Sequence, residues 1–137
     1  MRGTTRDSGR RAAIEATGAE CYIGDPDRIG TLTYALESAT LLCWLMGSAT
    51  GERERVAALH GTRLQMLLER TIDTTVRGVV YEAAGTIDDA TLAAGAEIVG
   101  AACAYSEIPY RLVRADPADH DAWLAAMRDA IGGLLSA

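Results

Sequence analysis

The 137-residue chain contains no lysine, no phenylalanine and no asparagine. Without lysine it cannot form a Schiff base, has no lysine for a phosphate-binding loop and cannot pair an ammonium group with a catalytic tyrosine. Any reaction chemistry must come from arginine, carboxylates, tyrosine, serine, threonine, cysteine and the two histidines. The missing residue types have AT-rich codons, so the composition predicts a bacterial source with a GC-rich genome.

Long apolar runs are also missing. No stretch is long enough to span a bilayer and no charged-then-apolar leader opens the chain, which predicts a cytoplasmic protein without membrane contact. Basic residues number 13 against 19 acidic ones, and the net charge of −6 has the wrong sign for a general nucleic-acid binder. We therefore expect neither a membrane nor a nucleic acid as partner.

Cysteine is sparse and scattered. Cys21, Cys43 and Cys103 are odd in number and widely spaced, so they predict no disulfide framework and a reducing compartment. Neither these cysteines nor His60 and His120 have the spacing of metal ligands. We expect no metal site and structural roles for all five residues.

Apolar residues make up 49% of the chain, and the period of the apolar pattern switches between strand and helix. Short apolar runs predict strands near residues 20–23, 40–46, 76–81 and 110–114, and the continuous run at 40–46 is typical of a strand buried on both faces. Capped amphipathic stretches predict helices near residues 8–17, 26–36, 52–73, 88–106 and from 118 onward. The alternation predicts one α/β domain over residues 1–137, with a parallel sheet and helices on both of its faces.

The carboxyl ends of the predicted strands carry short loops. Ligands of an open parallel sheet bind beyond these ends, which selects the segments 24–25, 47–51, 82–85 and 115–116. Three of them contain glycine or other small residues that let backbone amides approach a bound group, and each leads into a helix N-terminus that favours anions. One such segment alone is more typical of a tight turn, but several at one edge favour a ligand site.

Five short motifs occur in an order that resembles a known superfamily. They are residues 2–6 (RGTTR), 24–25 (GD), 43–49 (CWLMGSA), 79–85 (VVYEAAG) and 108–114 (IPYRLVR). Their order and spacing resemble the short-chain dehydrogenase/reductase superfamily, in particular its extended and atypical branch of NAD-dependent epimerase/dehydratase-like proteins. The resemblance covers nearly the whole chain and implies a Rossmann-like fold that binds an NAD(P) dinucleotide.

The resemblance also implies a set of cofactor-binding residues. An arginine at the position of Arg6 often meets the 2′-phosphate of NADP, which favours NADP over NAD, and the aspartate at the position of Asp25 approaches the adenine edge. The full set implied by the resemblance is Thr5, Arg6, Asp25, Gly47, Ser48, Ala49 and Ala83.

Two departures from the superfamily pattern limit this expectation. The G-x-G-x-x-G turn and the strand before it are absent, which removes the pyrophosphate cradle and predicts weak dinucleotide binding. The Tyr-x-x-x-Lys pair is absent, because Tyr105 is followed four residues later by Pro109 and Tyr110 by Arg114. Glu82 stands roughly where the superfamily has its catalytic serine or threonine. We expect weak or no catalysis and assign no catalytic residue; the alternatives are a non-enzymatic nucleotide-sensing or partner-binding module and a non-functional gene fragment.

The absent first strand has a structural consequence. In the strand order 3-2-1-4-5-6 it lies between the strand near residues 2–4 and the strand at 40–46. The chain thus resembles an N-terminally truncated Rossmann-like domain without its first βα unit, through a truncated gene, a misplaced start or a genuine short form. Because unpaired strand edges template association, we expect a marginal chain that forms a homodimer or aggregates through that edge. The alternative to dimerisation or aggregation is that the N-terminal segment lies beside residues 40–46 and closes the gap.

Overall fold

Strands and helices alternate along the computed structural model, which describes residues 1–136. The strands are β1 (Arg2–Thr5), β2 (Glu20–Ile23), β3 (Leu42–Trp44), β4 (Val79–Glu82) and β5 (Tyr110–Val113). The helices are α1 (Arg11–Glu15), α2 (Thr33–Leu36), α3 (Arg53–Leu59), α4 (Thr62–Thr71), α5 (Asp89–Ser106) and α6 (His120–Leu135), with 3₁₀ turns η1 (Ser8–Arg10) and η2 (Ile29–Leu32). The predicted α/β class is confirmed.

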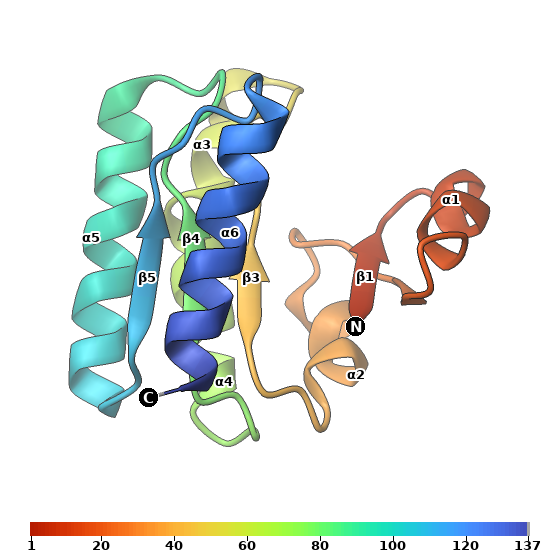
Figure 1. Cartoon of the computed structure of the whole chain (residues 1–137), viewed down its shortest axis with the longest axis horizontal. Helices are drawn as coiled ribbons and strands as arrows, with labels where there is room; N and C mark the ends of the chain where they lie inside the picture. The colour runs from red at the N-terminus through yellow and green to blue at the C-terminus, as the bar shows by residue number, and fades with distance from the viewer. Residues whose placement is uncertain (137) are drawn as a thin grey trace.

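The strands form two separate parallel sheets. One contains β1 and β2, with Arg2 opposite Glu20, and the other has the order β3-β4-β5, with Val79 between Leu42 and Tyr110. In Figure 1, β1, β3, β4 and β5 run toward the same end of the molecule, and β2 is parallel to β1. The predicted parallel pairing of the strands near 40–46 and 76–81 is confirmed, and the carboxyl ends of all five strands lie at one edge.

No ladder joins β1 to β3 within residues 1–136, and the two strands stand apart in Figure 1. Leu42 donates its N–H to the segment that leads into β4, so the backbone groups of the next residue, Cys43, face the other way. On β1, the carbonyl of Thr5 accepts from the end of β2, so the backbone groups of Thr4 face away from β2. The expected closure of this gap by the N-terminal segment is wrong, because that segment pairs with β2 as β1.

Helices cover both faces of the three-stranded sheet (Figure 1). Val79 and Tyr81 of β4 belong to the apolar cluster that includes residues of α4 and α5, whereas Val80 belongs to the cluster that it shares with α6. This division follows from the alternation of side chains along a strand. All four residues of β4 are buried, so β4 is the strand that is covered on both faces.

The apolar run at 40–46 was expected to be buried on both faces, and this expectation is wrong. Only Leu42–Trp44 form a strand; Leu42 and Cys43 are half-buried, and Leu45 is exposed. The reason is its position: β3 is the edge of the three-stranded sheet and faces the gap, so neighbours cover it less completely than they cover β4.

Two predicted helices have different limits in the structure. The helix expected from residue 26 begins only at Ile29, because the Asp25 carboxylate accepts the Asp27 N–H and an Asp25–Arg28 bridge turns the chain first. The helix expected over 52–73 is divided into α3 and α4 at His60, whose side chain is buried.

The remaining helices start close to their predicted caps. The segment expected at 8–17 forms η1 and then α1, after Asp7 accepts the Gly9 N–H. Asp88 caps α5 through the Thr91 N–H, and Asp119 caps α6. Within residues 1–136, no helix combines the length and apolar character needed to cross a membrane.

Candidate functional site

The carboxyl ends of β1 and β2 bring three of the implied cofactor residues together. The Gly24 N–H donates to the Thr5 carbonyl at 3.0 Å, which places the turn after β2 beside the end of β1. Thr5 is half-buried and its hydroxyl accepts the Asp7 N–H at 3.1 Å, whereas Arg6 is exposed. Asp25, half-buried, follows Gly24 directly. This corner presents a guanidinium, a hydroxyl and a carboxylate.

Asp27 connects this corner to the helices after β3. Its carboxylate pairs with Arg55 of α3 at 2.7 Å and with Arg63 of α4 at 3.3 Å. The hydrogen bond from Arg55, with the positive charges of Arg55, Arg63 and Arg6, holds the pKa of Asp27 below its usual range. The sequence offered no sign of this contact, because the partners lie 28 and more residues apart.

The loop after β3 holds the one glycine of the implied set, Gly47, with Ser48 and Ala49. The Gly47 carbonyl accepts the Ile87 N–H at 3.0 Å, and the Ser48 hydroxyl accepts the Thr86 N–H at 3.3 Å. The Ala49 N–H donates to the Met46 carbonyl at 3.2 Å, which closes the loop on itself. The loops after β3 and β4 are therefore joined at the carboxyl edge.

Glycine is required where these two loops touch. A Cβ on Gly47 would stand 1.9 Å from the Ala84 carbonyl oxygen, which no side chain tolerates. Gly85 has φ +144°, a conformation that L-residues with side chains rarely adopt. Ala83, half-buried, donates its N–H to the Val113 carbonyl at 2.8 Å. The glycines thus serve close loop packing.

Glu82 ends β4 as a buried carboxylate. Its Oε1 accepts the Gly47 N–H at 2.8 Å, and its Oε2 accepts the indole N–H of Trp123 at 2.7 Å. Trp123 is half-buried and extends from the first turn of α6. Both carboxylate oxygens of Glu82 thus accept hydrogen bonds from the protein.

Sequence reasoning missed a buried pair below the same edge. His60 Nδ1 lies 2.6 Å from the Tyr81 hydroxyl, and His60 Nε2 lies 2.8 Å from the Met46 carbonyl oxygen. A carbonyl only accepts, so Nε2 carries the hydrogen and Nδ1 accepts from the phenol. Burial raises the pKa of Tyr81 to about 12, helped by the nearby charge of Glu82, and burial lowers the pKa of His60. A neutral phenol and a neutral imidazole thus connect β4, the loop after β3 and the α3–α4 junction.

No protein-family model matches the sequence, and neither does any curated protein. Two solved structures share its architecture. One is Citrobacter sp. triphenylmethane reductase complexed with NADP(H), at 15% identity and a TM-score of 0.59, over 82% of this chain and 39% of that one. The other, from work on triphenylmethane dye bioremediation by the same reductase, has 18% identity and a TM-score of 0.61, over 82% of this chain and 38% of that one. The fold is Rossmann-like. The chain spans about two fifths of the length of these structures.

The Rossmann-like strand order explains the split sheet. The observed orders β2-β1 and β3-β4-β5 match the segments 3-2 and 4-5-6 of the Rossmann strand order 3-2-1-4-5-6. Strand 1 of that order would lie between these two segments, where no ladder joins β1 to β3 within residues 1–136. The implied cofactor residues accordingly fall into two groups, one on each side of the gap: Thr5, Arg6 and Asp25 at the β1–β2 corner, and Gly47, Ser48, Ala49 and Ala83 at the joined loops.

These two groups differ in how well they suit a dinucleotide. The β1–β2 corner offers an exposed guanidinium, Arg6, of the kind that pairs with phosphate groups, beside the half-buried Asp25. At the joined loops, the Gly47 and Thr86 amides already donate to protein oxygens, so they do not form a pyrophosphate cradle. Within residues 1–136, no group of three or more histidine, cysteine, aspartate and glutamate side chains could hold a metal ion.

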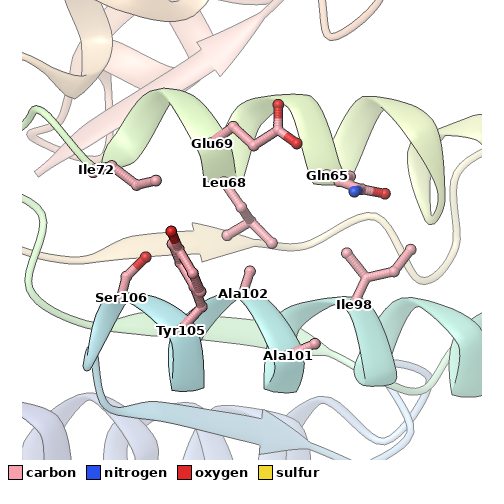
Figure 2. Close-up of a pocket in the computed structure, with 9 residues that line it drawn as sticks. All are labelled: Gln65, Leu68, Glu69, Ile72, Ile98, Ala101, Ala102, Tyr105 and Ser106. Carbon is pink, nitrogen blue, oxygen red and sulfur yellow. The ribbon is translucent and has the colours of Figure 1, made fainter.

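Two hollows of this Rossmann-like domain lie away from these residues. One of about 370 Å³ separates α4 and α5, and Figure 2 shows side chains of both helices lining it. Tyr105, at its end, is 87% exposed. A second hollow of about 430 Å³ adjoins it near the amino ends of β4 and β5. Neither hollow is lined by any of the seven implied residues.

Proposed function

We propose that this protein binds an NAD(P) dinucleotide along the carboxyl edge of its strands, as a cytoplasmic bacterial protein with weak or no catalysis of its own. The observation that carries the proposal is the β1–β2 corner. Two adjacent parallel strands of a Rossmann-like fold end there in Thr5-Arg6 and in Asp25, on one open surface. A structure of similar fold, the reductase from Citrobacter sp., is complexed with NADP(H).

NADP is preferred over NAD under this proposal. The exposed guanidinium of Arg6 follows β1 directly, and an arginine forms charge-assisted, often bidentate hydrogen bonds with a phosphate. The 2′-phosphate is the group that distinguishes the two cofactors. Its contact with Arg6 favours NADP by roughly tenfold or more in affinity.

Calorimetric titration of NADPH and NADH tests this preference. The wild type should bind NADPH more tightly, Arg6→Ala should bind both equally, and Arg10→Ala should behave as the wild type. Arg10 is the matched control because it is exposed in the same segment, at the end of η1. Equal affinities for both nucleotides in all three proteins would rule out the assignment.

Under this proposal binding is weak, because the sequence contains no G-x-G-x-x-G turn. Under this proposal residues 1–137 are one dinucleotide-binding domain without its first βα unit, which in this fold carries the glycine-rich pyrophosphate cradle. Catalysis is weak or absent because neither a Tyr-x-x-x-Lys pair nor a free proton donor at Glu82 is available.

The open edges support a second candidate, a non-enzymatic partner-binding module. The backbone groups of Thr4 and Cys43 face the gap, and unpaired edges of this kind template association. A homodimer through this edge is the simplest partner. Sedimentation of the purified chain over a range of concentrations tests it.

A further inference from the structure

The buried carboxylate of Glu82 joins two segments that are distant in sequence. Glu82 is 4% exposed, and its two oxygens accept from the Gly47 amide and the Trp123 indole. The first donor belongs to the loop after β3 and the second to the first turn of α6. Neither donor is a cation, so two hydrogen bonds compensate the burial of this charge.

The same loop is held from its other side. The segment after β4 donates to the Gly47 carbonyl through Ile87 and to the Ser48 hydroxyl through Thr86. The Ser48 side chain is exposed beyond this contact, and Ala49 is half-buried. The loop therefore places Ser48 and Ala49 at the carboxyl edge, and Glu82 fixes the loop at Gly47.

We propose that Glu82 is a positioning residue for the dinucleotide site: it holds the loop after β3 against α6, so that Ser48 and Ala49 keep a fixed place beside the bound nucleotide. This inference rests on the proposed function. Glu82 acts through the Gly47 amide and touches no reacting atom. The residue at the end of β4 thus shapes the site and supplies no proton.

Amide exchange measured by NMR tests the hold on the loop without any ligand. Glu82→Met is similar in length and cannot accept from either donor, so both the Gly47 amide and the Trp123 indole N–H should exchange at least about tenfold faster. Glu82→Gln, the milder variant should Glu82→Met fail to fold, keeps one carbonyl oxygen and should release at least one of the two. Glu97→Gln, which changes an exposed carboxylate of α5, should leave both rates unchanged. Unchanged exchange of both N–H groups in Glu82→Gln would overturn the proposal.

The affinities of two nucleotides distinguish a positioning role of Glu82 from a general destabilisation of the protein. Adenosine 2′,5′-bisphosphate reaches only the β1–β2 corner, whereas NADPH must also cross the gap to the loop after β3. Glu82→Gln should weaken NADPH about tenfold and leave adenosine 2′,5′-bisphosphate unchanged, as a split in Kd between the two ligands. Equal Kd values for NADPH in Glu82→Gln and the wild type would overturn the positioning role. A wild type that binds neither ligand would instead refute the proposed function, while the exchange rates would still decide whether Glu82 holds the loop.

Discussion

Replacing Tyr81 with phenylalanine tests how the middle of the domain is held together. The hydroxyl of Tyr81 donates to Nδ1 of His60 at 2.6 Å, and both side chains are buried, with 0% and 1% exposed. Tyr81→Phe removes one oxygen and keeps the ring. His60 Nε2 still donates to the Met46 carbonyl, so Nδ1 is left as a buried acceptor without a donor.

The expected loss of stability follows from the unpaired acceptor, Nδ1 of His60. Leaving one buried polar group without its partner costs about 1–3 kcal/mol, and the deleted hydroxyl no longer needs a partner of its own. We expect Tyr81→Phe to lower the free energy of unfolding by about 1–3 kcal/mol, out of a total that is typically about 5–15 kcal/mol. Tyr105→Phe is the matched control, because Tyr105 is 87% exposed and its hydroxyl is free to bond to water.

Urea unfolding followed by tryptophan fluorescence measures both variants, since Trp44 is buried in the same apolar cluster as Tyr81. The unfolding midpoint of Tyr81→Phe should fall, with little change in slope, and that of Tyr105→Phe should match the wild type. A Tyr81→Phe protein within about 0.5 kcal/mol of the wild type would refute the reasoning, because surface substitutions alone reach that size.

The same pair predicts the sign of a pH effect. Burial lowers the pKa of His60 in the folded protein below the ordinary value of about 6.5, so the unfolded chain takes up the proton first. The contribution of a neutral His60 is complete above about pH 6.5 and is lost as the pH falls toward the folded-state pKa. Carboxylates also titrate in acid, so the measurement is the difference between the wild type and His60→Gln. That difference should shrink as the pH falls below about 6.5.

Three further predictions concern the loops, the thiols and the open edges. Gly47→Ala should destabilise the protein by about 1–3 kcal/mol or more, because the new methyl group meets the Ala84 carbonyl, whereas Gly30→Ala, with open space around it, should be neutral in thermal melts. Equal melting temperatures would contradict the close loop contact. Cys103 is buried and its pKa is raised by burial to about 11, so a thiol reagent at pH 8 should modify Cys21 first, as peptide mass mapping over time would show. Early labelling of Cys103 would contradict its burial. The unpaired edges of β1 and β3 should make the chain self-associate, and adding an upstream strand with a glycine turn should give a monomer of higher melting temperature. A chain that sediments as a stable monomer without that addition would show that the edges need no partner.

Local sequence signals located several elements because their causes are local. Asp88 and Asp119 start α5 and α6 by accepting amides three residues onward, which needs no other part of the fold. The parallel pairing of the strands near 40–46 and 76–81 followed from their separation by a helical stretch, since parallel strands need such a crossover. Once parallel strands were predicted, the carboxyl edge and its loops followed.

Long-range partners decided the rest. The helix predicted over 52–73 breaks at His60, whose ring bonds to Tyr81, 21 residues later. Glu82 changes from a stand-in for a catalytic hydroxyl to a buried acceptor because Trp123, 41 residues away, supplies its N–H. Periodicity does not encode either pairing.

The apolar run at 40–46 shows most clearly what the sequence alone determines and what the tertiary structure decides. Its composition alone predicted a strand over 40–46, and the structure limits that strand to Leu42–Trp44. Whether that strand lies inside a sheet or at its edge depends on which strands stand beside it. With β4 on one side and the gap on the other, Leu42 and Cys43 are only half-buried, while Val79 and Val80 of β4 are fully covered. A strand's own residues set its preference for burial. The neighbouring strands and helices determine how much of its backbone and side-chain surface is removed from water.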